Sequence, residues 1–197
     1  MFETQAQSTI PSSISFTDQD IKDATARPTL KEGWFYFRVT SPARNGTTKN
    51  GHLSQSLILA PVDDMGETNI PTIQHRVILP FLNTEFEGHV KPRTFGFCQQ
   101  YLHAAQPKEH GAFPKKEGGA YTTEDGSVLD YDSATEYRET LSRAVYEEMQ
   151  RRWESPELYA GEEFFGKVVQ NGEFLNVEKL RPVAPDDEEV EYSSFMA

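Results

Sequence analysis

A single hairpin near the C-terminus constrains the fold more than any other part of this sequence. Residues 163–180 form two runs of apolar, β-branched and aromatic side chains that flank Asn171-Gly172. Asn-Gly provides the positive φ angles of a tight type I′ turn, so the pattern predicts two antiparallel strands. A two-stranded ribbon is only marginally stable in water, and this one must therefore complete a sheet that begins earlier in the chain. Arg181-Pro182 ends the second strand, because proline cannot donate to a strand ladder.

The first half of the chain supplies the rest of that sheet. Strands are predicted over 33–40, 52–60 and 74–81, each rich in aromatic and branched side chains. Alternation gives the first strand one hydrocarbon face, expected in the core, and one face of aromatic and cationic side chains. The hydrocarbon face holds Phe35, Phe37 and Val39, and the other face holds Trp34, Tyr36 and Arg38.

Two helices are predicted between the third strand and the hairpin. The first covers 92–105 and begins at Pro92; the second is capped by Asp132-Ser133 and runs to about Trp153. On the second helix the arginines, Arg152 among them, are assigned to the face away from the core. Residues 106–132 between the helices are rich in glycine and read as a functional or disordered loop whose role the sequence leaves open.

Three strands, a helical insertion and two further strands make the order of a five-stranded OB-fold-like barrel, with helices between strands three and four. A generic α+β sheet is the alternative. The expected organisation is a flexible N-terminal arm over 1–27, an OB-fold-like domain over 28–184 with its insertion at about 92–155, and a disordered acidic tail over 185–197. Residues 21–26 of the arm are expected to form a short helix.

Charge and composition narrow the class of protein. The formal net charge of the 197 residues is −12, of which the five acids from Pro185 to Ala197 contribute −5, leaving −7 for the body. An acidic body argues against a surface that binds nucleic acid everywhere, but it allows a local basic groove. Apolar runs are too short to span a membrane, no secretory signal is recognisable, and the single Cys98 excludes an intrachain disulfide. We expect a cytoplasmic protein, in the host cytoplasm if it is viral.

The chain resembles the OB-fold single-stranded DNA-binding proteins of bacteriophages. The resemblance rests on the strand 33–40, the basic glycine-rich loop after it, the helix before the closing hairpin, residues 165–180, and the acidic tail, and it extends from about Lys31 to the end. It implies binding of single-stranded DNA in replication, recombination or repair, and a tail that recruits partner proteins and competes with DNA. The chain departs from the pattern in its large insertion and in the Met196-Ala197 that follow Phe195.

A protein that binds single strands without sequence preference needs aromatic rings on which bases stack and cations that contact the backbone phosphates. The candidate nucleic-acid-binding residues are Trp34, Tyr36, Arg38, Arg44, Lys49, Arg76, Lys167 and Lys179. For each aromatic residue, packing beneath the inserted helices is an equally good interpretation. Each lysine or arginine has the alternative of being an ordinary solvated surface residue. On the binding interpretation, Trp34→Ala is expected to lose DNA affinity without unfolding the protein.

The tail has a second predicted role, because its composition cannot form a packed core and its carboxylates resemble a phosphate backbone. The residues expected to contact partners are Asp186, Asp187, Glu188, Glu189, Glu191, Tyr192 and Phe195. A merely solubilising tail is the alternative.

Enzyme motifs are lacking: the five histidines are scattered, and no phosphate-binding loop or hydrolase motif is present. We therefore expect no catalysis, no cofactor and no metal, and read Cys98 as a small core residue. A protein-interaction or virion structural module on the same barrel is the alternative function, and a metal-dependent nucleic-acid enzyme is a third. An apolar groove would favour a protein partner, and clustered cations would favour DNA. Oligomeric state, including a homo-oligomer, and DNA versus RNA preference stay open.

Overall fold

A computed structural model of the chain describes residues 30–63, 65–68, 71–82, 92–172 and 174–186. The predicted N-terminal arm with its short helix, and the tail beyond Asp186, lie outside these residues. The strands are β1 (Gly33–Val39), β2 (Arg44–Thr47), β3 (His52–Pro61), β4 (Ile73–Leu82), β5 (Lys115–Glu117), β6 (Ala120–Thr122), β7 (Val128–Leu129), β8 (Glu163–Asn171) and β9 (Phe174–Arg181). The helices are α2 (Pro92–Ala105), α3 (Tyr131–Glu154) and the 3-10 turn η1 (Pro156–Tyr159).

Six strands form the main sheet, and its neighbouring strands pair antiparallel throughout the described residues. The long β3 pairs with β4 along one edge and with β2 and then β1 along the other; β1 continues to β8 and β8 to β9. Four successive antiparallel pairings lead from β4 to β9, so these two strands run in the same direction. They do not pair with each other within the described residues. The main sheet is therefore open between β4 and β9 and does not close into a barrel, whereas the predicted OB-fold-like barrel is only partly open.

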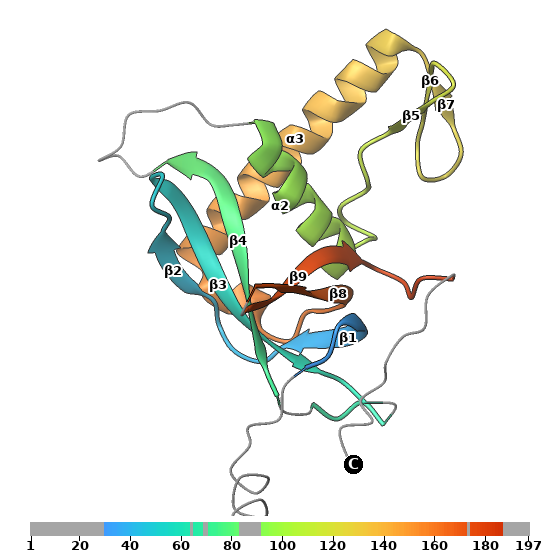
Figure 1. The fold of residues 1–197 in the computed structure, drawn as a ribbon. Helices are drawn as coiled ribbons and strands as arrows, with labels where there is room; N and C mark the ends of the chain where they lie inside the picture. The colour runs from blue at the N-terminus through green and yellow to red at the C-terminus, as the bar shows by residue number, and fades with distance from the viewer. Residues whose placement is uncertain (1–29, 64, 69–70, 83–91, 173, 187–197) are drawn as a thin grey trace, which may run out of the picture.

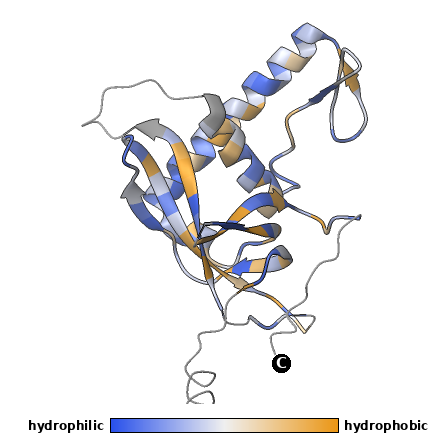
Figure 2. Cartoon of the chain, in the orientation of Figure 1, coloured by the Kyte–Doolittle hydropathy of each residue, from blue (hydrophilic) through white to orange (hydrophobic). Residues whose placement is uncertain are grey.

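Figure 2 shows hydrophobic and hydrophilic residues interspersed along the strands of the main sheet. Along β1 they alternate, as a strand with one covered face requires. The predicted hydrocarbon face of β1 is confirmed, since Phe35, Phe37 and Val39 are all buried in the core. The rings of Phe35 and Phe37 lie 5.8 Å apart. Burying each such side chain stabilises the fold by about 1.5–3 kcal/mol.

The closing hairpin is confirmed, with its turn one residue later than predicted. Asn171 is the last residue of β8 and pairs with Phe174, so the turn begins after Asn171 and includes Gly172. Gly172 has a φ of 65°, whereas no described non-glycine residue has a positive φ, which excludes the type I′ geometry that needs one at Asn171. Glycine is required for a different reason at Gly166, where a Cβ would lie 2.7 Å from Val177 Cγ1.

The inserted segment differs from the prediction. Helix α2 has the predicted bounds, and α3 begins just before the predicted cap because the Asp130 carboxylate accepts a hydrogen bond from the Ser133 amide at 2.8 Å. The supposed loop 106–132 contains a small antiparallel sheet, β5-β6-β7. Figure 1 shows this sheet beside the N-terminal end of α3, which projects away from the main sheet. The C-terminal end of α3 reaches the main sheet, where the Gln55 amide donates to the Arg152 carbonyl at 2.7 Å, and α2 packs against β4.

A buried ion cluster fastens α3 to the sheet. Arg152 is fully buried, contrary to its predicted exposed position, and its guanidinium contacts Glu162 at 2.6 Å and Glu148 at 2.7 Å. Tyr101 of α2 also donates to Glu162, at 2.6 Å, and the Tyr159 ring lies 4.7 Å from the guanidinium carbon. The carboxylates compensate a charge that would otherwise be costly to bury, and the cluster holds α2, α3 and the start of β8 in one arrangement.

Candidate nucleic-acid interface

The outer face of β1 carries Trp34, Tyr36 and Arg38 together, as predicted, and the register places Lys167 of β8 and Lys179 of β9 in the row of Trp34. Residues paired across antiparallel strands lie on the same face of the sheet. The nitrogen of Lys167 and the guanidinium of Arg181 lie 6.0 Å and 5.2 Å from the Trp34 ring centre. The sequence therefore identified a real cluster of aromatic rings and cations.

This cluster does not offer the open stacking platform that the sequence suggested. Trp34 is only 1% exposed, so no base can reach its ring in this structure. Its indole nitrogen is buried and has no hydrogen-bond partner among the described residues. The two cations above the ring and the complete burial point to a packing role for Trp34. The expectation that Trp34→Ala would leave the fold intact is revised accordingly.

The other two side chains of this face, Tyr36 and Arg38, both bind Glu163 of β8. Its carboxylate accepts hydrogen bonds from the Tyr36 hydroxyl at 2.6 Å and from Arg38 Nε at 2.6 Å. Burial alone would raise the pKa of Glu163, but the bonds from Tyr36 and Arg38 and the charge of Arg38 outweigh it, and the pKa is lowered. The charge of Arg38 is thus balanced by the Glu163 carboxylate at neutral pH, so Arg38 is poorly placed to hold a phosphate.

A second region of the same outer face, formed by β2, β3 and β4, keeps its cations open. Arg44 pairs with Ser56, and Ser56 pairs with Arg76, so one row across three strands carries two guanidinium groups separated by a serine. The strand spacing places the two arginine Cα atoms about 10 Å apart. Both arginines are exposed, and neither has an ion pair among the described residues. We call the outer surface of β2, β3 and β4 around Arg44, Ser56 and Arg76 the arginine face.

The floor of the arginine face is low beside Ser56, where β2 meets β3, and it is bordered by Ile78 of β4 and Ile58 of β3. Gly46 pairs with Ser54 in the row next to Ser56, so no large side chain from β2 or β3 stands between the arginines and the strand backbone. Lys49, also exposed, lies in the turn that joins β2 to β3. Side chains on this scale let a ligand backbone approach the sheet closely, which suits contacts between cations and phosphates.

The far edge of this face reaches an aromatic ring that the sequence patterns did not reveal as a candidate. Phe174, the first residue of β9, is 73% exposed. It lines a shallow cavity of about 420 Å³ together with Gln74, Arg76 and Asn176. Its pairing with Asn171 follows from the turn, but its exposure depends on the open edge between β4 and β9, which no local pattern indicated.

Two further predicted residues, Lys167 and Lys179, both lie in the row of Trp34. Lys167 is half-buried beside Trp34, and Lys179 is exposed on β9. Asp186 is exposed, whereas Asp187, Glu188, Glu189, Glu191, Tyr192 and Phe195 lie outside the described residues. Across the described ranges, no group of three or more histidine, cysteine or acidic side chains is placed to hold a metal ion.

Searches of protein-family models, curated proteins and solved structures found no significant match to this chain. The resemblance to phage single-stranded DNA-binding proteins therefore stays a prediction. In the part of the chain that the structure describes, no helix combines the length and apolarity needed to cross a membrane.

Proposed function

We propose that this protein binds single-stranded DNA on the arginine face, without catalysing a reaction, and acts in DNA replication, recombination or repair. The observation that carries the proposal is the row Arg44, Ser56 and Arg76, which presents two exposed cations across three adjacent strands. Phe174 at the edge of the face adds a ring on which a base can stack.

The strand order supports the same proposal. Strands β1, β3, β4, β8 and β9 follow one another in the order of an OB-fold, with α2 and α3 inserted between its third and fourth strands, and β2 extends the first connection. We propose that the fold is an OB-fold variant left open between β4 and β9. OB-folds bind oligonucleotides on the face of their second and third strands, which correspond here to β3 and β4.

A salt series tests the function. Fluorescence anisotropy would follow binding of a labelled thymidine 30-mer and of a duplex of equal length, over a range of NaCl concentrations. We expect tighter binding of the single strand, and affinity that falls with salt because phosphate contacts release counterions. Equal affinity for the duplex, or binding that salt does not weaken, would contradict the proposal.

A double variant tests the site. In Arg44→Ala/Arg76→Ala, the slope of log affinity against log salt should fall by about 1.4, because each phosphate that is no longer neutralised lowers it by about 0.7. The matched control is Lys108→Ala/Arg143→Ala, which removes two exposed cations elsewhere. Phe174→Ala should cost about 1–3 kcal/mol of binding if a base stacks there, whereas Tyr131→Ala, at a ring exposed on α3, should change nothing. A double variant that binds like the control would remove the arginine face from consideration.

The tail remains part of the proposal. We propose that residues 185–197 recruit replication or recombination proteins and compete with DNA for the basic face, because their charge imitates a phosphate backbone. A chain that ends at Ala184 should then bind the thymidine 30-mer more tightly, with a weaker dependence on salt. Unchanged binding would leave the tail a solubilising segment.

A protein-interaction module is the second candidate function, and one observation favours it. The cavity on the inner side of the open edge, between β4, β9 and α2, is mainly apolar, and an apolar groove suits a protein partner better than a phosphate backbone. The two functions use opposite faces of β4 and are compatible in one molecule.

A further inference from the structure

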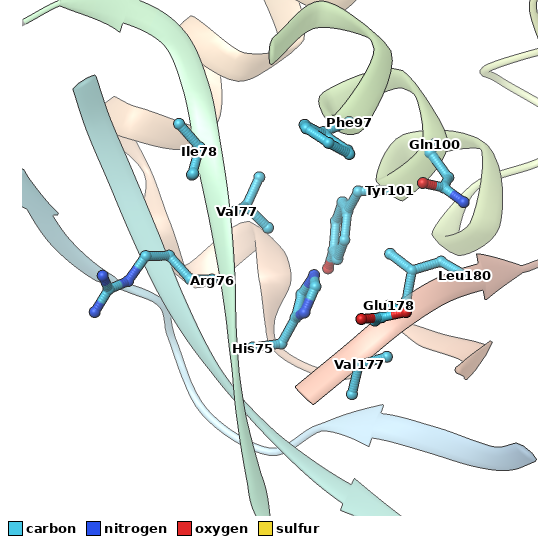
Figure 3. Close-up of a pocket in the computed structure, with 10 residues that line it drawn as sticks. All are labelled: His75, Arg76, Val77, Ile78, Phe97, Gln100, Tyr101, Val177, Glu178 and Leu180. Carbon is cyan, nitrogen blue, oxygen red and sulfur yellow. The ribbon is translucent and has the colours of Figure 1, made fainter. Parts of the chain in front are cut away.

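The open edge of the sheet encloses a cavity distinct from the arginine face. Its volume is about 410 Å³, and it lies between β4, β9 and α2. Figure 3 shows His75 and Val77 pointing from β4 toward α2, while Arg76 and Ile78 point away from the cavity. The strand therefore presents Arg76 and Ile78 to the outer side of the sheet and His75 and Val77 to the cavity.

The cavity walls are apolar and aromatic. Val77, Val177 and Leu180 come from the two strands, and Phe97 and Tyr101 come from α2. Phe97 is 54% exposed at the cavity, an unusual degree of exposure for a phenylalanine ring. His75 stacks on Tyr101 with ring centres 6.4 Å apart and planes 15° from parallel. Such walls hold one large apolar side chain by its surface area.

The charge of the cavity is negative. Burial lowers the pKa of His75 to about 4, so this ring is neutral at pH 7. Glu178, an exposed residue of β9, points toward His75 in Figure 3. Among the described lining residues, the only charge directed into the cavity is thus a carboxylate, and the chain as a whole carries −12. A phosphate backbone would be repelled here, whereas a cation would be attracted.

The cavity is bordered by unpaired strand edges. Among the described residues, neither β4 nor β9 has a strand partner on the side that faces the other. An extended segment lying along such an edge can hydrogen-bond to it through its main chain, with its alternate side chains entering the groove.

We infer that the cavity between β4, β9 and α2 docks an extended, basic segment of a partner protein, which inserts one large apolar side chain between Phe97 and Val177 and places an adjacent lysine or arginine against Glu178. The walls select the apolar residue, Glu178 selects the charge, and the strand edges select the extended backbone. This site is independent of the arginine face, which lies on the other side of β4.

The test uses the full chain, isotopically labelled, and three synthetic peptides monitored by amide chemical shifts. The first peptide is Gly-Ser-Lys-Phe-Lys-Ser-Gly; the second replaces phenylalanine with serine; the third replaces both lysines with glutamate. We expect saturable shifts in 73–82, 92–105 and 174–181 with the first peptide, and at least tenfold weaker binding of the other two.

Two variants locate the contacts. Glu178→Lys, at an exposed position that should tolerate the change, is expected to weaken the lysine peptide at least tenfold and to strengthen the glutamate peptide. Phe97→Ala should weaken the first peptide about tenfold. The matched controls are Glu147→Lys and Tyr131→Ala, exposed residues of α3 at which neither peptide should respond.

Several results would overturn the inference. Equal binding of the peptide without phenylalanine, or indifference to Glu178→Lys, would mean general attraction to an acidic protein. Displacement of the peptide by a thymidine 30-mer from these same amides would make the cavity a nucleic-acid site. Peptide binding only to a chain that ends at Ala184 would identify the chain's own tail as the occupant. Shifts that depend on protein concentration without peptide would identify a second copy of the chain.

Discussion

Two regions on the outer face of the sheet use the same residue types and differ in what surrounds them. On the face of β1 and β8, the Trp34 ring is covered and Arg38 is held by Glu163. On the arginine face, Arg44 and Arg76 flank a serine and stay exposed. Alternation along a strand thus places a side chain outward, but the neighbouring strands decide whether it is available to a ligand.

The largest expected effect would separate packing from binding at Trp34. Trp34→Ala should destabilise the protein by about 3–5 kcal/mol, because it removes a fully buried indole and leaves a cavity. Denaturant unfolding measures this loss, and the affinity of the folded fraction for a thymidine 30-mer should stay within about twofold. Trp34→Phe, which keeps most of the packing, is the control. A stable Trp34→Ala protein with tenfold weaker binding would instead make the covered face part of the site.

A smaller effect is expected from removing the carboxylate that pairs with Arg38. Glu163→Gln removes the charge that holds Arg38, so it should add about one phosphate contact and steepen the salt slope by about 0.7. The half-exposed ion pair itself contributes about 1 kcal/mol or less to stability. Anisotropy titration measures the first effect and thermal unfolding the second, with Glu157→Gln as the control. An unchanged slope would show that Arg38 is excluded from DNA by more than its carboxylate.

The smallest effect is a change with pH in the stability that Glu163 contributes. The pKa of Glu163 is below its ordinary value of 4.5 in the folded protein, so its stabilising contribution is fully present above that pH and is lost as pH falls through the folded pKa. The difference in melting temperature between wild type and Glu163→Gln should therefore shrink as the solution is acidified from above pH 4.5 to well below it. A difference that stayed constant through this window would show that the charge of Glu163 does not stabilise the fold.

Local elements are easier to predict from this sequence than the points at which they meet. Alternation over 33–39 and the glycine of the closing turn follow from short-range geometry, and the structure has both. Helical periodicity assigns Arg152 to solvent, because its partners Glu148 and Glu162 gather around it only after α3 packs on the sheet. Similarly, Arg44 and Arg76 are both candidates from the sequence, but their shared row depends on β3 pairing with two strands at once, which no local pattern specifies.

Cys98 offers a practical consequence of how α2 sits on β4. Its thiol donates to the Ile78 carbonyl at 3.1 Å, and burial raises its pKa to about 12. As the sole cysteine of the chain, it should resist maleimide dyes until the helix lifts from the strand. A cysteine introduced at the surface of the native protein can therefore be labelled with a fluorophore without background labelling of Cys98. In the wild type, the rate of Cys98 modification would measure how often α2 separates from β4.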